Sequence, residues 1–295
     1  MVVSASRGSL MPYLRLMRPA NLLTAAADVL AGYAVAEFAD ARALGLLLVS
    51  TTGLYAAGVV FNDVFDAKLD AIERPERPIP SGRATAGGAA ALGTILLATA
   101  IPSAFAASRT SGVIALLIAV CAVFYDGWGK HIPVVGPVSM ASCRGLNLLL
   151  GLSAAPLLLS ERWYVGLLNF TYVVAITVLS AGEVRGGKRA VSMLALGLLG
   201  TVVAGTIVLA KAPGFGLIAA LPFAVLFSWR VLPPFWRAYR EPQAGIIRSA
   251  VKVGVLSLIV LDSAIGAGYG GILYGAMILS LSWLAGRMAR LFAVT

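Results

Sequence analysis

Residues 44–70 read LGLLLVSTTGLYAAGVVFNDVFDAKLD. The first two thirds of this stretch carry no charged side chain and are long enough for a helix to cross a bilayer, which takes about 20 apolar residues. The stretch then ends in five polar residues, Asn62, Asp63, Asp66, Lys68 and Asp70. Ionisable side chains at a membrane are costly and are usually functional. The pattern therefore predicts a membrane helix that ends in a polar site.

The whole chain has the composition of a membrane protein. Hydrophobic residues make up 59% of its 295 residues and charged residues only 12%, whereas soluble domains average roughly 45–50% and about 25%. Apolar runs recur at residues 21–39, 44–64, 85–107, 112–126, 136–159, 163–181, 190–210, 214–232, 246–265 and 270–289. The fourth run is short for a full span, and the last two could be one span and a re-entrant segment. We expect an all-α, polytopic transmembrane bundle of nine or ten helices that forms a single domain over residues 1–295.

The positive charge of the chain follows this topology. The net charge is +10, and with ten spans most of the 23 lysines and arginines fall on one side of the membrane. These are Arg7, Arg15, Arg18, Lys68, Arg74, Arg77, Arg83, Lys130, Arg185, Lys188, Arg189, Arg230, Arg237, Arg240, Arg248, Lys252, Arg287 and Arg290. By the positive-inside rule that side is cytoplasmic, and so are both termini. No cleavable signal-peptide pattern precedes the first run. We expect a multi-pass protein of the cell membrane, the lipid bilayer as a partner, and no nucleic acid.

The three aspartates after the second run have helical spacing. Asp63, Asp66 and Asp70 stand at i, i+3 and i+7, so on a continuing helix all three face the same way. Like charges placed this way repel one another unless a cation lies between them. Mg²⁺ suits such a site because it takes one or two carboxylates and keeps its other positions for water and substrate phosphates. The alternative interpretation is a solvated helix end.

A proline-rich loop with two arginines follows at once, ERPERPIPSGR at residues 73–83. The prolines end the helix and stiffen the loop, which would hold Arg77 and Arg83 beside the acidic cluster. Guanidinium groups bind phosphate oxygens in pairs, so metal and arginine together indicate a diphosphate. Alternatively, these arginines only enforce the topology.

The two motifs together resemble those of the UbiA superfamily of intramembrane prenyltransferases, whose first motif reads NDxxDxxxD and is followed by an RPxPSG loop. Two further motifs are similar: Arg18-Pro19-Ala20-Asn21 resembles the RPxN start of the first helix, and Tyr125 to Lys130 resembles the tyrosine–lysine motif after the fourth. The number and orientation of the helices agree over nearly the whole chain.

The resemblance implies a helical bundle around a central cavity open toward lipid. It also implies Mg²⁺-dependent ionisation of an isoprenoid diphosphate and capture of the allylic cation by an aromatic or other lipophilic acceptor. Carried over by position, Asn62, Asp63 and Asp66 would hold the metal with Asp70 in support, and Asp63 and Asp66 would be the catalytic residues. The diphosphate contacts would be Lys68, Arg77 and Lys130.

The chain departs from the family pattern at the second acidic motif. The position after the sixth run reads SAGEVRGGKR, residues 180–189, with Glu183 as its one carboxylate. Either that metal site is reduced to a single ligand, or Arg185 and Lys188 replace the charge of a second Mg²⁺. The glycines could bring backbone N–H groups close to an anion.

A narrower resemblance, carried by GEVRGG and by RGLNLLLG in the fifth run, is to the UbiA-like protein of ebo gene clusters. It keeps a rival hypothesis open, a UbiA-fold protein with altered catalysis that binds or translocates a lipophilic or aromatic metabolite precursor. An unrelated ten-helix transporter is a third hypothesis. Transporters place their substrate groups near the midplane, whereas these acidic residues cluster at one interface.

Several polar residues lie inside the apolar runs or at their ends. Arg144, with Asn147 one turn later, should face the cavity or pair with a carboxylate, either Asp28 or Asp262. Cys121 and Cys143 are expected to be packing residues, and His131, the single histidine, excludes a histidine-based metal site. The substrate-binding residues that we expect are Asn21, Lys68, Arg77, Tyr125, Asp126, Lys130, Arg144, Asn147, Arg185 and Lys188, and the metal ligands are Asn62, Asp63, Asp66, Asp70 and Glu183.

Overall fold

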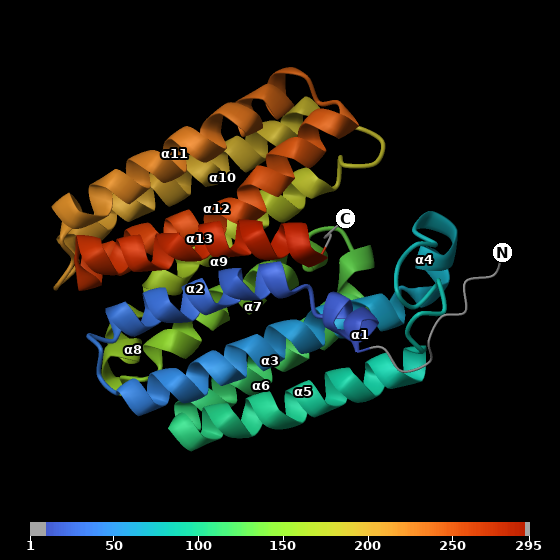
Figure 1. The fold of residues 1–295 in the computed structure, drawn as a ribbon. Coiled ribbons are helices and arrows are strands. Elements are labelled where there is room, and N and C mark those ends of the chain that lie inside the picture. The colour runs from blue at the N-terminus through green and yellow to red at the C-terminus, as the bar shows by residue number, and fades with distance from the viewer. Residues whose placement is uncertain (1–9, 293–295) are drawn as a thin grey trace.

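The computed structural model describes residues 10–292, and over this range it consists of helices and connecting loops without strands (Figure 1). The helices are α1 (Met11–Leu16), α2 (Pro19–Val35), α3 (Ala41–Phe65), α4 (Ala67–Glu73), α5 (Ala86–Ala107), α6 (Arg109–Gly127), α7 (Val135–Leu152), α8 (Pro156–Arg162), α9 (Gly166–Ser180), α10 (Arg189–Val208), α11 (Leu217–Arg240), α12 (Ala244–Gly270) and α13 (Ile272–Phe292). Short 3-10 turns cover Gly129–His131, Trp163–Val165 and Leu209–Lys211.

Side-chain caps fix the starts of three long helices. The Asp40 carboxylate accepts a hydrogen bond from the Arg42 N–H at the start of α3. The Thr85 hydroxyl accepts from the Gly88 N–H at the start of α5, and the Ser108 hydroxyl accepts from the Ser111 N–H at the start of α6. Such caps satisfy backbone donors that have no partner within the helix.

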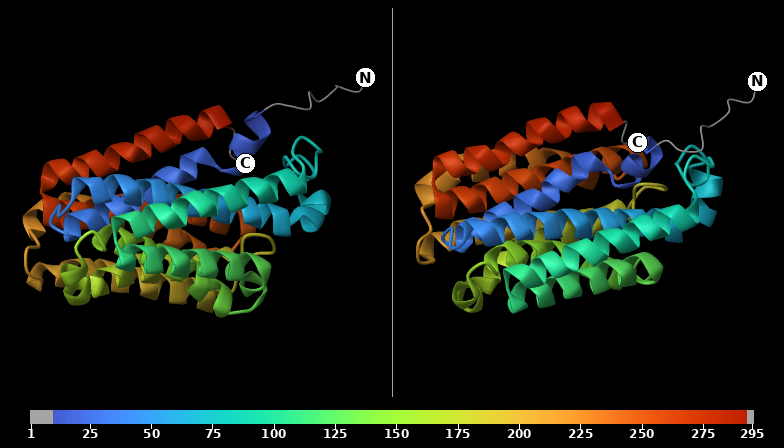
Figure 2. Two further views of the ribbon diagram at one scale, coloured as in Figure 1. Left: turned by 90° about the horizontal axis from the view of Figure 1, so that it is seen from below. Right: turned by 60° about the horizontal axis from the view of Figure 1, so that its bottom comes forward.

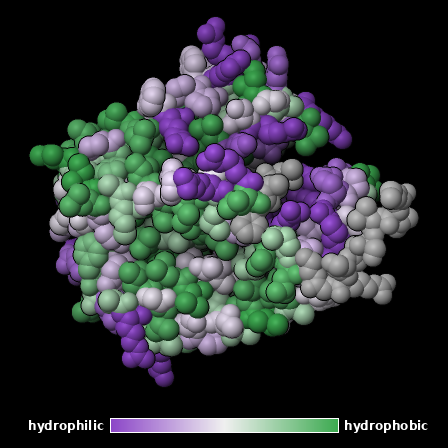
Figure 3. Space-filling view, in the orientation of Figure 1, coloured by the Kyte–Doolittle hydropathy of each residue, from purple (hydrophilic) through white to green (hydrophobic). Residues whose placement is uncertain are grey.

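Each apolar run expected from the sequence coincides over most of its length with one helix, although the run 136–159 extends past the end of α7 into α8. Within the described residues, seven helical segments are long and apolar enough to cross a membrane. The short fourth run is lengthened by its polar start into the 19-residue α6, and the last two runs form separate helices, α12 and α13. Large apolar side chains such as Leu157, Trp229 and Leu273 are exposed. Figure 3 shows hydrophobic residues over most of the face seen in Figure 1, with hydrophilic ones gathered at the top and upper right and a smaller group at the lower left. This is a multi-pass membrane protein.

Six helices surround a cavity and four lie outside them. The cavity is lined by residues of α2, α3, α6, α7, α9 and α12, whereas α5, α10, α11 and α13 cover the outside of this inner ring (Figures 1 and 2). Glycines bring α2 and α7 into close contact: a Cβ at Gly32 would lie 2.0 Å from the Leu148 carbonyl oxygen, and one at Gly151 would lie 2.1 Å from that of Val29. Small residues allow this approach in membranes, and it places the polar side chains of both helices within reach of one another.

Candidate active site at the acidic end of the cavity

The cavity between the inner helices has a volume of about 540 Å³. One end, which we call the acidic end, is formed by the last turn of α3, the loop after α4, the end of α6 and the segment after α9. From there the lining extends inward as far as Ala25, Thr51 and Asn147. The cavity therefore joins a charged opening to an interior that lies among apolar helices.

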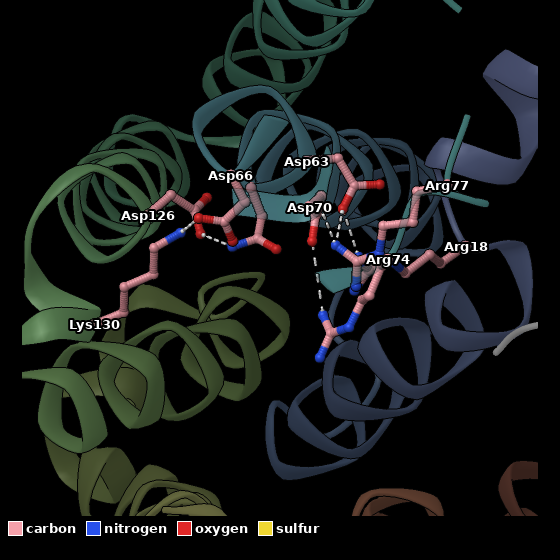
Figure 4. Close-up of polar contacts among 9 residues, drawn as sticks. Arg18, Asp63, Asp66, Asp70, Arg74, Arg77, Asp126 and Lys130 are labelled. Carbon is pink, nitrogen blue, oxygen red and sulfur yellow. Dashed lines mark hydrogen bonds and ion pairs between the residues drawn. The ribbon is translucent and has the colours of Figure 1, made fainter. Parts of the chain in front are cut away.

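Asp63 and Asp70 are buried and share one guanidinium group. The Arg77 Nη1 donates to Asp63 at 3.2 Å and to Asp70 at 2.6 Å, and these carboxylates are only 6% and 3% exposed. Arg18 donates to Asp63 at 2.7 Å, and Arg74 approaches Asp70 at 4.0 Å. The sequence predicted a cation between the closely spaced aspartates, and in this structure that cation is the Arg77 guanidinium (Figure 4).

Asp66 faces away from this pair, so the prediction that all three aspartates point the same way is wrong. The helix does not continue: α3 ends at Phe65 and α4 begins at Ala67, with Asp66 between them at φ −85° and ψ 0°. The Asp66 carboxylate accepts from the Lys130 Nζ at 2.5 Å. Asn62 donates to Asp126 at 3.1 Å on the same side. The acidic end has two ionic groups, one at Arg77 and one at Lys130 (Figure 4).

Arg18 belongs to the first group because of its backbone. It adopts a left-handed conformation, φ 48° and ψ 64°, directly before Pro19, which starts α2. Such a conformation is uncommon for a residue with a side chain and persists where surrounding contacts hold it. Here the Arg18 guanidinium bonds to Asp63 across the cavity opening.

The altered second motif contributes one acidic side chain. Glu183 lines the cavity, where burial raises the pKa of its carboxyl group while Arg248 and Arg74 oppose that rise. The N–H groups of the adjacent glycines bond to backbone carbonyl groups. The Gly187 N–H donates to the Pro242 carbonyl at 2.9 Å, and the Gly186 N–H donates to the Gly182 carbonyl at 3.0 Å. Those two N–H groups are therefore not available to an anion.

A polar network closes the inner end of the cavity. Arg144 pairs with Asp28 at 2.8 Å, which confirms that it has a carboxylate partner. Asn147 also donates to Asp28, at 2.8 Å. Asn169 bridges Asp28 and Asp262 with bonds of 3.1 and 2.9 Å. The network joins α2, α7, α9 and α12 and presents Arg144 and Asn147 to the cavity.

The structure brings together part of the expected site. Tyr125, Asp126, Arg144, Asn147, Asn62 and Glu183 line the cavity, and Arg77 does so beside the aspartates. In the described part of the chain, eight expected residues are absent from the lining: Asp63, Asp66, Asp70 and Lys130, which belong to the two ionic groups at its opening, and Asn21, Lys68, Arg185 and Lys188. The last three are exposed. Arg83 is also exposed, and it bonds to Ser81 and to the Glu76 carbonyl within its own loop.

Two arginines at the site were not predicted as site residues, Arg18 and Arg74. Both line the cavity opening. The RPxN motif was the available signal for Arg18, because it placed this residue at the start of the first long helix. Arg74 gave no signal beyond its position in the loop.

The donor atoms of the acidic end are of the kind that Mg²⁺ prefers. Asn62, Asp63 and Asp66 offer amide and carboxylate oxygens within about one helical turn, and hard cations take such ligands. Across residues 10–292, however, no three or more His, Cys, Asp or Glu side chains are grouped as a metal site. Arg77 pairs with Asp63, and Lys130 pairs with Asp66. The ligand chemistry fits Mg²⁺, and binding requires the carboxylates to exchange these partners.

Comparisons with known proteins give matches to both the sequence and the fold of the chain. The model of the UbiA prenyltransferase family matches residues 22–250. The digeranylgeranylglyceryl phosphate synthase of Methanoculleus marisnigri is 30% identical over 228 residues, which cover 73% of this chain and 78% of that protein. The apo structure of a UbiA homolog from Aeropyrum pernix has a TM-score of 0.70 at 16% identity, over 82% of this chain and 96% of that one. A UbiA homolog from Archaeoglobus fulgidus bound to GPP and Mg²⁺ has a TM-score of 0.55 at 15% identity, over 91% and 99%.

Proposed function

The chain belongs to the UbiA prenyltransferase family, and we propose that it transfers the prenyl group of an isoprenoid diphosphate to a lipophilic or aromatic acceptor within the cavity. The observation that carries the proposal is the acidic end, where buried carboxylates and cationic side chains alternate at the opening of a cavity among membrane helices. The match to the prenyltransferase family model and the similarity to synthases of digeranylgeranylglyceryl phosphate support a prenyltransferase.

The cationic side chains of the acidic end would hold the diphosphate. Arg18, Arg74 and Arg77 line the opening on one side, and Lys130 reaches Asp66 from the other. Guanidinium groups can bind phosphate oxygens two at a time. A diphosphate placed between the two groups would be neutralised as its negative charge develops.

The metal ligands would be Asn62, Asp63 and Asp66, with Asp70 and Glu183 in support. Mg²⁺, when bound, supplies positive charge to the oxygens of the diphosphate that leaves. The homolog bound to GPP and Mg²⁺ supports a divalent-metal requirement. Asp70, held by Arg77 at 2.6 Å, would orient that arginine rather than bind the metal directly.

The reaction needs a dry cavity and an acceptor. The bond between the first prenyl carbon and the diphosphate oxygen breaks, and its electron pair leaves with the diphosphate. An electron pair of the acceptor forms the new bond to that carbon, and the acceptor loses a proton to water at the opening. Val173, Ile176, Val251, Val255 and Leu258 line the interior and would keep water from the allylic cation.

A second candidate function is binding or translocation of a lipophilic precursor, as the narrower resemblance to the ebo-cluster protein suggests. The single carboxylate of the altered second motif favours it. Against it stands the opposite end of the bundle, where buried Arg162 ties the Val35 carbonyl, at 2.9 Å, to Glu37, at 2.6 Å. These contacts of Arg162 would have to break for a substrate to pass.

For the orientation of the bundle in the membrane, we propose that the acidic end and both termini face the cytoplasm.

The experiment that tests the function is Mg²⁺-dependent release of diphosphate. Purified protein is given allylic diphosphates of several lengths, with and without a lipid extract as the source of acceptor. We expect release to vanish in Asp63→Ala and to fall in Glu183→Ala. Glu76→Gln, which changes an exposed carboxylate in the same loop, is the matched control.

The outcomes separate the two candidates. Release with a prenylated product, lost in Asp63→Ala, supports the transferase. Mg²⁺-dependent binding of every donor without release contradicts it and supports the binding protein. Release that survives in Asp63→Ala contradicts the assigned metal site.

A further inference from the structure

The inner end of the cavity carries polar groups far from the diphosphate residues. Arg144, Asn147, Thr51 and Tyr55 line it, and Arg144 lies over the Tyr55 ring at 4.9 Å from the ring centre. Resting on the function proposed above, we propose that this group binds the acceptor, and that it takes a neutral oxygen function, a hydroxyl or a carbonyl, rather than a carboxylate or a phosphate.

Arg144 has donors to spare. Its Nη1 donates to Asp28 at 2.8 Å and its Nη2 to Thr24 at 2.6 Å. A guanidinium carries five N–H groups, and no further hydrogen bond of Arg144 occurs among the described residues. Its side chain is 9% exposed, and the exposed part can face only the cavity that it lines. A bound apolar chain would leave these N–H groups without partners, which is unfavourable.

The neighbouring side chains orient Arg144 and leave one more free group. The Asn147 amide donates to the Ala25 carbonyl at 2.9 Å and to Asp28 at 2.8 Å, so both of its N–H groups are used. The Thr51 hydroxyl donates to the Asn147 oxygen at 2.7 Å. The Tyr55 hydroxyl makes no hydrogen bond within residues 10–292. Arg144 and Tyr55 are therefore the groups that a ligand can address.

The charge of the network decides the kind of ligand. The Arg144 cation is already paired with Asp28, and Asn169 connects Asp28 to a second carboxyl group, that of Asp262. An anion brought here would lose its hydration without finding an unpaired cation. A neutral oxygen loses far less and still accepts hydrogen bonds from Arg144 and Tyr55.

The facing wall separates the two substrates. On α9 and α12 the lining at this depth is Val173, Ile176, Val255 and Leu258, all apolar. A prenyl chain can lie against that wall, whereas the acceptor needs the wall formed by α3 and α7. The acceptor class is thus a lipophilic molecule with one neutral oxygen group directed toward Arg144.

The test uses three probes that share a ring system: 1-naphthol, naphthalene and 1-naphthoate. Their binding is measured on protein in nanodiscs that is saturated with Mg²⁺ and an unreactive thiolodiphosphate analogue of geranyl diphosphate, with empty nanodiscs as the blank. We expect 1-naphthol to bind about fivefold more tightly than naphthalene, the effect of roughly one hydrogen bond, and more tightly than 1-naphthoate.

Two variants, Tyr55→Phe and Arg144→Lys, test whether Tyr55 and Arg144 cause the tighter binding of 1-naphthol. Tyr55→Phe keeps the ring under Arg144 and removes the hydroxyl, so the preference for 1-naphthol should shrink or vanish while the thiolodiphosphate binds as before. Tyr33→Phe is the matched control, because Tyr33 is buried outside the cavity lining. Arg144→Lys keeps the charge and changes the donors, and it should weaken 1-naphthol selectively.

Each other outcome overturns the inference. Tightest binding of 1-naphthoate would mean that the site takes anions. An unchanged preference in Tyr55→Phe, or no binding of 1-naphthol, would mean that the network only joins the helices. In those cases the thiolodiphosphate still binds, and the proposed transferase function is not contradicted. Failure of the thiolodiphosphate to bind the wild-type protein would instead contradict the transferase function itself.

Discussion

Replacing Arg77 by glutamine should change the affinities for metal and for diphosphate in opposite directions. Arg77 holds Asp63 and Asp70, and because the proposed metal site uses Asp63, arginine and Mg²⁺ would compete for that carboxylate. Arg77→Gln removes the competitor, so Mg²⁺ alone should bind more tightly. The diphosphate loses a guanidinium partner and should bind less tightly.

The magnitude follows from the contacts. A hydrogen bond to a charged group contributes about 1.5–3 kcal/mol, and the 2.6 Å bond to the 3%-exposed Asp70 is the larger loss, because Arg18 remains on Asp63 at 2.7 Å. We expect the metal-free variant to be destabilised by about 2 kcal/mol, which lowers the melting temperature by roughly 4–8 °C. A comparable loss of diphosphate binding is about 30-fold in Kd.

The assay is thermal unfolding in detergent, followed by circular dichroism, with Mg²⁺ and the thiolodiphosphate added separately. Because a ligand of the folded state raises the melting temperature, Mg²⁺ should raise that of Arg77→Gln by more than that of the wild type. Arg83→Gln is the control, since Arg83 is exposed and bonds only within its loop. Equal Mg²⁺ effects in wild type and Arg77→Gln, or equal destabilisation by Arg83→Gln, would refute the competition.

Three further outcomes are expected. Asp66→Asn should reduce Mg²⁺-dependent diphosphate release by at least about 100-fold, because it removes a metal ligand, and a rate within tenfold of wild type would show that the metal lies elsewhere. Lys130→Gln should raise the Kd of the thiolodiphosphate by roughly tenfold in a direct binding assay and leave naphthol binding unchanged; an unaltered Kd would exclude Lys130 from the diphosphate site. Arg162→Gln should lower stability by about 2 kcal/mol, seen in thermal unfolding, because it breaks the tie to the Val35 carbonyl, while release at 25 °C stays within twofold; a large loss of release would link the two ends of the bundle.

The architecture could be predicted because it depends on properties that add up along the chain. Apolar length and low charge predict membrane helices wherever they occur, and each predicted run corresponds to a helix. The pairing of Arg144 could be predicted in the same way, since an unpaired cation inside a bilayer is very unfavourable. Its partner could not be chosen between Asp28 and Asp262, because that choice depends on the glycine contacts that set α2 against α7.

The direction of the aspartates could not be predicted, because it depends on one residue at a helix boundary. The spacing of Asp63, Asp66 and Asp70 assumes a continuous helix, and the chain breaks the helix at Asp66. Cations lie on both sides of the break. Arg77, from the loop after α4, pairs with Asp63, and Lys130, from the segment after α6, pairs with Asp66. Spacing alone carries no information about such partners.

The second motif shows why a basic residue near a motif is not yet a site residue. Arg185 and Lys188 follow Glu183 directly, yet the turn that carries them is fixed to the segment before α12 by the Gly187–Pro242 hydrogen bond, and both side chains are exposed. Two arginines act on Glu183, Arg248 near the start of α12 and Arg74 from a loop more than a hundred residues earlier in the chain, and of these two Arg74 lines the cavity. The proline-rich loop can place it there because α4 ends at Glu73 and Asp70 holds the guanidinium near the opening. The positive charge that neutralises the diphosphate on this side would therefore come from the first motif. The second motif has fewer carboxylates than the family pattern, and the arginine that lies there instead cannot be recognised from the residues of the second motif.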